Sequence, residues 1–190
     1  MQIRSKGQYL TPVLVVGGGP AGSSCAWKLA SSGVRCLLID KVEFPRDKVC
    51  GGALSSRAAE LLTGSGMITS AELDRLTEKT HRTLSLWNRN ELLSTYTSNS
   101  HPVRIISRAG FDNFLLEKAA SSGAEMMTPE TALSFDSSTA RTSYGRSIRF
   151  SFLVGADGCG SSVRRAYFGR SGRKTGFGIE YSLPDRKSVV

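Results

Sequence analysis

A glycine-rich turn between two apolar segments is the feature that most constrains the fold of this 190-residue chain. The run GGGPAG, residues 17–22, follows the short apolar, mainly β-branched segment 13–16 and opens a helical pattern that extends to Ser32. A second buried strand is expected over 34–39, directly before Asp40. Strand, glycine-rich turn, helix and strand form a βαβ unit, whose two strands are expected to be parallel with a right-handed crossover.

The spacing within this turn predicts a dinucleotide-binding site. Gly17, Gly19 and Gly22 fit the pattern GxGxxG. The first glycine permits a tight turn, the second lets a pyrophosphate approach the backbone, and the third lets the helix pack on the sheet. Backbone N–H groups and the positive helix end would then hold the phosphates. Asp40, which lies 18 residues beyond Gly22, is placed to bind an unphosphorylated ribose, as in FAD or NAD.

A turn near residue 157 predicts a second contact with the nucleotide. A strand expected over 148–154 feeds the run GADG at 155–158. Here the sequence resembles the flavoprotein hydroxylase superfamily, whose second fingerprint is a strand that runs into an Asp-Gly turn beside the FAD. The resemblance favours FAD over NAD as the cofactor and implies that Asp157 and Gly158 contact it.

Arg108 begins a third matching segment, SRAGFDNFLLEKAA. In this superfamily an arginine at the start of such a helix reaches the flavin nucleotide, which implies the same role for Arg108, followed here by Phe111 and Asp112. The residues alone indicate only that a cation at a helix N-terminus is unfavourable unless an anion lies nearby. A solvated arginine at the end of a helix is the alternative interpretation.

The loop FPRDKVCGGALS, residues 44–55, narrows the resemblance to the geranylgeranyl reductase family within this superfamily. A similar run lies over the flavin in that family, which implies that Cys50 and the Gly51-Gly52 backbone border the isoalloxazine and the substrate channel, with Arg46 near the cofactor. Two glycines would let the backbone approach a flat ring, and a thiol can border an apolar substrate. Arg46 and Lys48 could lower the pKa of Cys50, whereas an inert buried thiol is the alternative.

The resemblance implies an FAD-dependent oxidoreductase that reduces isoprenoid C=C bonds in a prenyl diphosphate or prenyl lipid, with NAD(P)H or ferredoxin left open as electron donor. An FAD-dependent monooxygenase or halogenase of the same superfamily and a non-catalytic nucleotide-binding remnant are the alternatives. An NAD-dependent dehydrogenase leaves the Asp-Gly turn unexplained. Cys50 is the candidate catalytic residue, at the substrate channel. The expected cofactor-binding residues are Gly17, Gly19, Pro20, Ala21, Gly22, Asp40, Lys41, Arg46, Cys50, Gly51, Gly52, Arg108, Asp157 and Gly158.

The expected fold class is α/β, a Rossmann-like FAD-binding domain with a parallel sheet and an antiparallel β-hairpin insertion, followed by the start of a second, substrate domain. Alternation of apolar and polar residues over 83–87 and 92–97 predicts the hairpin. A helix is expected over 53–62, and a less regular polar segment from there to Thr80. The FAD-binding domain is expected over 1–80 and 100–168, and an incomplete substrate-domain portion over 81–99 and 169–190.

The C-terminal part of the chain departs from the superfamily pattern. A third fingerprint of the superfamily, a Gly-Asp turn that contacts the pyrophosphate, does not follow Asp157. The chain is therefore expected to be C-terminally truncated relative to the family. A fragment, a gene remnant and a reduced flavoprotein are all compatible with this departure.

Composition and charge narrow the classes of partner. The chain is 39% apolar and 22% charged, which is typical of a globular protein. Its net charge of +9 comes from dispersed cations, so nucleic acid is not expected, while anionic ligands and peripheral membrane contact stay open. The sequence has neither a leader pattern nor an apolar run of about 18 residues, so a cytoplasmic chain is expected. The four cysteines are far apart, so neither a metal site nor disulfides are expected, and Cys25 and Cys36 are expected to be packing residues.

Overall fold

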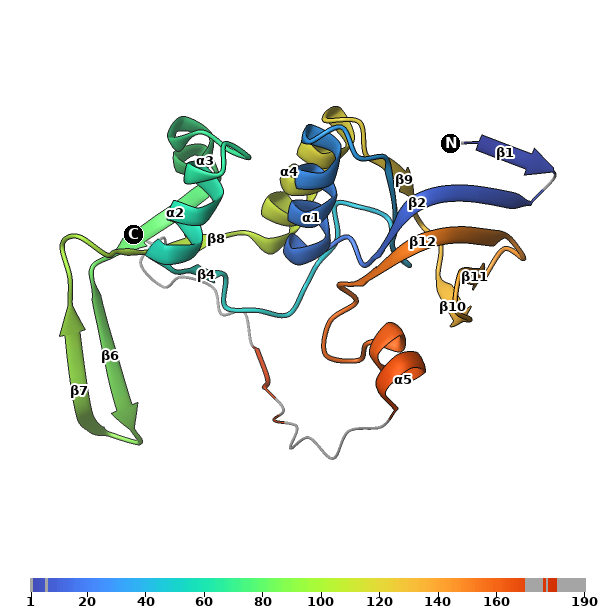
Figure 1. Ribbon diagram of the computed structural model, residues 1–190. Coiled ribbons are helices and arrows are strands. Elements are labelled where there is room, and N and C mark those ends of the chain that lie inside the picture. The colour runs from blue at the N-terminus through green and yellow to red at the C-terminus, as the bar shows by residue number, and fades with distance from the viewer. Residues whose placement is uncertain (1, 6, 170–175, 177, 181–190) are drawn as a thin grey trace.

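A mixed sheet of seven strands forms the centre of the structure, a computed structural model that describes residues 2–5, 7–169, 176 and 178–180. The strand order is β10-β11-β12-β2-β3-β9, and β1 pairs with the start of β2 (Figure 1). The strands are β1 (Gln2–Ser5), β2 (Gln8–Val16), β3 (Cys36–Ile39), β9 (Glu125–Met127), β10 (Ala132–Phe135), β11 (Thr139–Thr142) and β12 (Ser147–Gly155).

The parallel strands of this sheet end side by side. Val16 of β2 lies opposite both Ile39 of β3 and Gly155 of β12, and Ile39 lies opposite Met127 of β9. The residues that follow these strands therefore share one edge of the sheet, the carboxyl edge at which open α/β sheets bind their ligands. The predicted α/β fold is confirmed, with antiparallel strands β1, β10 and β11 added at the sides of the parallel core.

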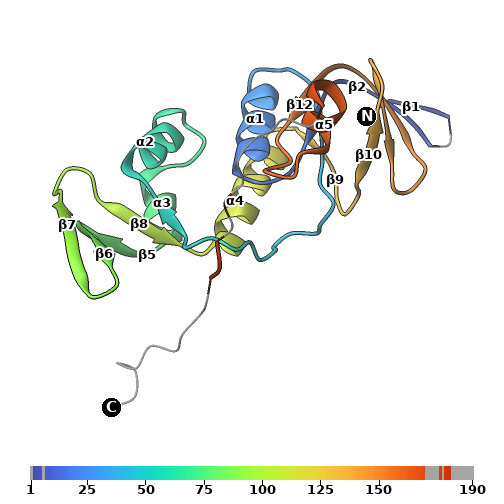
Figure 2. The same ribbon diagram turned by 90° about the horizontal axis from the view of Figure 1, so that it is seen from below.

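Alternate side chains of β2 face two different layers. Val13 and Val15 pack under α1 (Pro20–Ser31) and α4 (Arg108–Ser121), which lie next to each other on one face of the sheet (Figures 1 and 2). Leu14 and Val16 face the opposite side, where β10, β11, β12 and α5 (Ser162–Phe168) cover them. Burial on both faces explains why the central strands are continuous apolar runs rather than alternating ones.

A smaller antiparallel sheet of three strands lies beside α4, with β4 and β5 on opposite edges of β8. Two short helices, α2 and α3, pack against it through an apolar cluster that also includes Ile106, Phe111 and Leu115. This cluster connects the smaller sheet to α4. The elements are β4 (Ala53–Leu54), α2 (Ser56–Gly64), α3 (Ser70–Leu76), β5 (Thr77–His81) and β8 (Val103–Ile106).

The start of α2 differs from the prediction. The helix expected over 53–62 begins at Ser56, because Ala53 and Leu54 pair with β8 instead. The side chain of Ser55 accepts a hydrogen bond from the Ala58 N–H at 3.3 Å and so caps the helix. A tertiary pairing has therefore shortened a helix that local propensity would have extended.

The segment before Thr80 also differs from the prediction, because it contains α3 rather than irregular chain. Thr69 and Glu72 form a capping box at its start, in which each side chain binds the backbone N–H of the other residue. Glu72 additionally accepts a hydrogen bond from Lys118 Nζ at 2.6 Å, which ties α3 to α4. The capping-box residues were present in the sequence as a helix signal.

The predicted hairpin is present as β6 (Thr83–Asn88) and β7 (Glu91–Thr97), with Leu84 opposite Tyr96. It extends away from both sheets (Figure 1), and its side chains are exposed. Assignment of 81–99 and 169–190 to a substrate domain stays a prediction, and most of 169–190 lies outside the described residues. In the part of the chain that the structure describes, no helix is both long enough and apolar enough to cross a bilayer.

Candidate dinucleotide site

Gly17 and Gly22 are required by close contacts between backbone segments at the carboxyl edge of the sheet. Gly17 has φ +107°, and a Cβ atom there would lie 2.4 Å from the carbonyl oxygen of Ala156. A Cβ atom at Gly22 would lie 1.7 Å from the carbonyl oxygen of Gly17. The Ala156 N–H donates to the Val16 carbonyl at 2.8 Å. These contacts bring the turn after β2, the start of α1 and the turn after β12 together.

Gly19 differs from Gly17 and Gly22 because no backbone atom of the described chain approaches the position of its Cβ. Its φ of −70° suits any residue, and the nearest atom to a Cβ placed there is Nη2 of Arg46, at 3.6 Å. Gly19 is also the N-cap of α1, which has no side-chain cap and no acidic residue in its first turn. The space and the positive helix end together fit an approaching phosphate.

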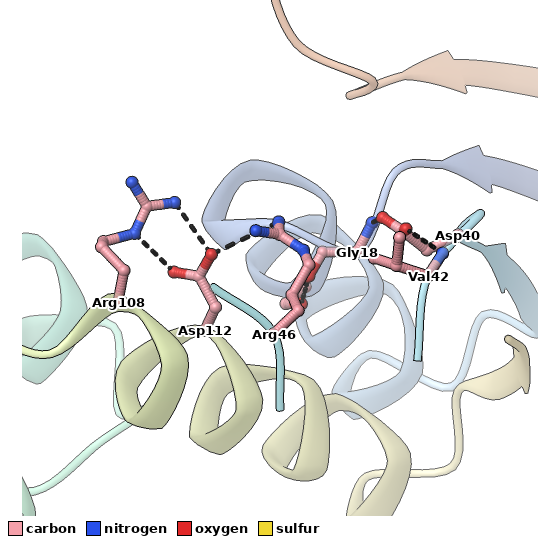
Figure 3. Close-up of polar contacts among 7 residues, drawn as sticks. Gly18, Asp40, Val42, Arg46, Arg108 and Asp112 are labelled. Carbon is pink, nitrogen blue, oxygen red and sulfur yellow. Dashed lines mark hydrogen bonds and ion pairs between the residues drawn. The ribbon is translucent and has the colours of Figure 1, made fainter. Parts of the chain in front are cut away.

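Asp40 lies at the end of β3 and binds the glycine-rich turn directly. Its Oδ2 accepts a hydrogen bond from the Gly18 N–H at 2.6 Å, and its Oδ1 accepts one from the Val42 N–H at 3.0 Å (Figure 3). Each carboxylate oxygen can accept more than one hydrogen bond, so a ribose diol could still bind. Lys41, the next predicted residue, has an exposed side chain.

Asp157 holds the start of α5 as well as lying beside the glycine-rich turn. Its carboxylate accepts hydrogen bonds from the Ser161 hydroxyl at 2.5 Å, from the Ser162 N–H at 2.5 Å and from the Val163 N–H at 3.3 Å. Burial raises the pKa of Asp157, but these hydrogen bonds together hold it below its ordinary value. Its backbone nitrogen lies 2.9 Å from a Cβ placed at Gly17, so this turn helps to shape the nucleotide site.

Arg108 and Arg46 meet at one buried carboxylate, that of Asp112 (Figure 3). Arg108 donates from Nε to Oδ1 at 2.9 Å and from Nη2 to Oδ2 at 2.8 Å. Arg46 Nη2 lies 3.4 Å from the same Oδ2, and its guanidinium stacks on the Phe44 ring with a centroid distance of 4.8 Å. The anion that Arg108 needs at the start of α4 is therefore provided within the chain.

Cys50 is exposed beside Arg108. A hydrogen bond from the Gly52 N–H and another from Arg108 lower the pKa of the Cys50 thiol. These two contributions are larger than any from Arg46 or Lys48, to which the loop sequence pointed. The Cys50 N–H donates to Glu180 Oε2 at 2.6 Å.

Cys36 and Cys25, which lie in the main sheet and in the helix that covers it, differ from Cys50 in the pKa of their thiols. Cys36 is buried in β3, where burial raises the pKa of its thiol to about 11. Cys25 of α1 is half-buried, and burial raises its thiol pKa in the same direction. The chain therefore has one cysteine, among these three, whose environment favours the thiolate.

An apolar cavity of about 500 Å³ begins at Cys50, Gly52 and Arg108. Most of its lining comes from apolar side chains of α1, α2, α4 and the connection after α2, among them Trp27, Leu61, Leu62, Met67, Phe111 and Leu115. Lys28 of α1 also borders it, so two cations lie on a lining that is otherwise mainly apolar. Cavities of this size and polarity are typical of sites for small ligands.

Several of the predicted site residues follow one another along a track, of which Figure 3 shows the part from Asp40 to Arg108. It runs from Asp40, through the glycine-rich turn and Arg46, to Arg108 and Cys50. An acceptor for a ribose, a space for phosphates and two cations follow one another along it, which fits an extended dinucleotide such as FAD. Among the described residues there is no cluster of side chains that could hold a metal ion.

Three residues of this track had been given no role from the sequence. Asp112 was part of a quoted motif, and its spacing of four residues from Arg108 on a predicted helix was the signal that could have paired them. Gly18 supplies an N–H to Asp40, and the Phe44 ring would lie 3.2 Å from a Cβ at Gly18. No local pattern marks those two contacts, because they join segments that meet only in the folded chain.

Comparison with known proteins agrees with this geometry. Residues 10–178 match the family described as FAD binding domain. Menaquinone reductase from Mycolicibacterium smegmatis is 31% identical over 176 residues, which cover 88% of this chain and 42% of that protein. Geranylgeranyl diphosphate reductase from Rhodobacter capsulatus is 32% identical over 166 residues, covering 79% of this chain and 38% of that protein. The chain thus spans about two-fifths of the length of these curated relatives.

Solved structures with a similar arrangement of elements include two oxygenases by title. PqsL from Pseudomonas aeruginosa, titled a probable FAD-dependent monooxygenase, is similar with a TM-score of 0.70 and 22% identity over 88% of this chain and 48% of that one. 2-Methyl-3-hydroxypyridine-5-carboxylic acid oxygenase is similar with a TM-score of 0.70 and 26% identity, covering 83% of this chain and 42% of that one. The first likeness shows the fold alone.

Proposed function

Because this chain belongs to the FAD binding domain family, whose cofactor is FAD, we propose that it is the cofactor-binding part of an oxidoreductase that reduces isoprenoid C=C bonds. The observation that carries this proposal is the apolar cavity that begins at Cys50, Gly52 and Arg108, at the opposite end of the track from Asp40. Two relatives at 31% and 32% identity, a menaquinone reductase and a geranylgeranyl diphosphate reductase, support the same choice.

Each part of the track has a task in this proposal. The turn 17–22 and the start of α1 bind the pyrophosphate, and Asp40 binds the adenosine ribose. Arg46 and Arg108 carry the positive charge along the remainder of the cofactor, with Asp157 and Gly158 at the turn beside Gly17. FAD, when bound and reduced by the electron donor, would supply the hydride for the reduction. Cys50 borders the reacting bond and, because a lowered thiol pKa makes it a stronger acid, is the candidate group to donate the proton that completes the reduction.

The polarity of the cavity selects the class of substrate. Burial of an isoprenoid chain against apolar side chains is favourable, at about 25 cal/mol per Å² of apolar surface removed from water. Lys28 and Arg108 on the same lining could bind a diphosphate or another anionic head group. A prenyl diphosphate or a prenyl lipid satisfies both requirements, with NAD(P)H or ferredoxin as the electron donor that remains to be identified.

An anaerobic reaction tests this function. The purified chain is titrated with FAD while flavin fluorescence is followed, then the bound flavin is reduced and mixed with geranylgeranyl diphosphate. Reoxidation of the flavin together with a saturated product by mass spectrometry supports the proposal. Replacement of Cys50 with Ser should slow this reoxidation while the dissociation constant for FAD stays the same. Reduced flavin that persists with every prenyl substrate would exclude the proposal for this chain.

A second candidate function is a monooxygenase or halogenase reaction. The oxygenase with 26% identity and a brominase from Pseudoalteromonas luteoviolacea, 29% identical over 114 residues, favour it. When oxygen, an aromatic substrate and a halide are added to the same reduced protein, this candidate predicts rapid reoxidation of the flavin with a hydroxylated or halogenated aromatic product. A chain that binds FAD but gives neither kind of product would instead be a non-catalytic nucleotide-binding remnant.

A further inference from the structure

Asp112 is a buried charge in the middle of the candidate site. Its side chain is fully buried in the second turn of α4. A buried carboxylate loses the stabilisation that water provides and is tolerated only when cations and hydrogen bonds compensate for it. Asp112 receives that compensation from two arginines that come from different segments of the chain.

The two arginines share the carboxylate unequally. Arg108, at the first position of α4, uses both oxygens in a bidentate pair at 2.9 and 2.8 Å. Arg46, from the loop before β4, reaches only Oδ2, at 3.4 Å. Two cations that would otherwise repel each other are thereby held side by side (Figure 3).

Both arginines keep donors for another partner. A guanidinium group has five N–H donors, and the contacts with Asp112 use only some of them. Figure 3 shows one terminal nitrogen of Arg108 directed away from Asp112. Arg46 Nη2 lies 3.6 Å from a Cβ placed at Gly19, and Arg108 lines the same cavity as Cys50. One guanidinium group therefore lies near the glycine-rich turn and the other near the thiol.

A second buried carboxylate in the same chain shows a different arrangement. Glu130 is buried and pairs with Arg146 alone, at 2.7 Å, and its Oε1 has no hydrogen-bond partner. Arg146 lies between the rings of Tyr9 and Tyr144, on the antiparallel side of the main sheet. That pair holds strands together, whereas the pair of arginines at Asp112 faces the space along the cofactor track.

We propose that Asp112 is a positioning residue for the cofactor, one buried carboxylate that holds Arg108 and Arg46 so that their free donors meet the anionic part of FAD. The inference rests on the FAD binding of the proposed function and is independent of the isoprenoid substrate. Asp112 touches neither the cofactor space nor Cys50 in this role, and acts through the two arginines.

Titration of the Asp112→Asn variant with FAD distinguishes two roles of Asp112, holding the two arginines in position and only neutralising their charge. Asparagine keeps the size of the side chain but offers one acceptor oxygen, so at least one arginine loses its partner. We expect the dissociation constant for FAD to rise about tenfold, the loss of one charge-assisted hydrogen bond. If Asp112 only neutralised charge, its removal would leave two unpaired cations beside the phosphates. FAD would then bind more tightly, and that result would overturn the proposal.

A measurement on Cys50 tests the same role without FAD. If Asp112 holds Arg108 beside the thiol, Asp112→Asn should shift the midpoint of the alkylation pH profile of Cys50 upward. If Arg108 instead stayed beside the thiol after losing the neutralising carboxylate, its charge would stabilise the thiolate more strongly. The midpoint would then shift downward, which would contradict the proposal. Glu180, whose charge opposes the thiolate, is common to both proteins. Should the unsubstituted chain bind no FAD, the proposed function fails and this measurement still decides the role of Asp112.

Two further variants control for a loss of structure. Asp74→Asn removes the pair between Asp74 and Arg104, at 3.3 Å on the surface, and should change neither FAD affinity nor the Cys50 profile. Arg108→Lys leaves Asp112 and the charge in place but removes the bidentate geometry. It should weaken FAD binding about tenfold as well, even if Asp112→Asn does not fold. An unchanged dissociation constant in Arg108→Lys would contradict the proposal.

Discussion

The two ends of the cofactor track are built in different ways. At the nucleotide end, formed by the turn 17–22, Asp40 and Asp157, backbone atoms of three segments touch at the edge of the parallel sheet. At the thiol end, formed by 46–52, Arg108 and Asp112, a loop and a helix are joined by charged side chains. Each end nevertheless contains at least one glycine at which a Cβ would collide with the backbone and one glycine at which it would not.

Because of this difference, we expect the two ends to respond differently to substitutions. Backbone contacts at Gly17 and Gly22 leave no room for a new atom, so a substitution at either glycine acts on folding. Side-chain pairs at the thiol end can be altered one charge at a time, so substitutions there act on binding and on the thiol pKa. The following predictions test this separation, from the largest expected effect to the smallest.

The largest effect is expected at Gly22. Because its Cβ would lie 1.7 Å from the Gly17 carbonyl oxygen, Gly22→Ala must displace either α1 or the turn. We expect a loss of about 3 kcal/mol or more in the free energy of unfolding, measured by urea denaturation. Gly19→Ala is the matched control, since its Cβ meets only Arg46 at 3.6 Å. Its stability should stay within about 0.5 kcal/mol while FAD binding weakens. Equal destabilisation of both variants would contradict the comparison.

The corresponding pair at the thiol end is Gly52 and Gly51. Gly52 has φ +68°, and a Cβ there would lie 2.3 Å from the carbonyl oxygen of Ile106. Gly52→Ala should therefore cost about 2 kcal/mol or more and separate β4 from β8. For Gly51, a Cβ would have no neighbour within 4 Å. Gly51→Ala should therefore have the same melting temperature as the parent chain, whereas that of Gly52→Ala should be lower. Thermal denaturation of the two variants checks both expectations.

A smaller effect is expected at Asp157, where side-chain acceptors stabilise a helix start. Asp157→Asn should cost about 1 kcal/mol, because one oxygen that accepts from the start of α5 is replaced by an NH2 group. The pKa of Asp157 is lowered in the folded state, so its contribution is complete above the ordinary carboxyl pKa and disappears as the pH falls through the folded value. The difference in stability between the two proteins should accordingly shrink in acid. A constant difference from neutral pH to strongly acidic pH would argue against this role.

The smallest change concerns the reactivity of Cys50. Its lowered pKa means that, between that value and the ordinary thiol pKa, more thiolate is present than in an unperturbed cysteine. Iodoacetamide at mildly alkaline pH should therefore label Cys50 before Cys25 and Cys36, whose thiol pKa values are raised. Mass spectrometry of the labelled peptides gives the order. Labelling of Cys36 first would show that the thiol end is not organised as described.

The nucleotide end could be predicted from the sequence to a large extent. Gly17, Gly22 and Asp40 lie in one short βαβ unit, where spacing along the chain implies proximity in space. The helix α3 could also have been predicted, because Thr69 and Glu72 form a capping box that is visible in the sequence. Pairing of Ala53 and Leu54 with β8 could not, since it depends on a strand about 50 residues away.

The thiol end depended on resemblance for its residues and on tertiary structure for its organisation. The loop motif identified Arg46 and Cys50, but their meeting with Arg108 joins segments some 60 residues apart. The buried position of Asp112 decides how both arginines are held. Burial is a property of the packed layers and not of local spacing, so no pattern within α4 shows that this one carboxylate is inaccessible to water.

By itself, the sequence determined the parallel βαβ core, the glycine-rich turn and a dinucleotide-binding site, because hydrophobic period and glycine spacing act over a few neighbouring residues. Only the tertiary structure decided that Arg46, Cys50 and Arg108 gather around Asp112, and that an apolar cavity begins beside them. The physical reason is that charge pairing and cavity shape depend on which distant segments are brought within a few ångströms, and packing of α1, α2 and α4 sets those distances.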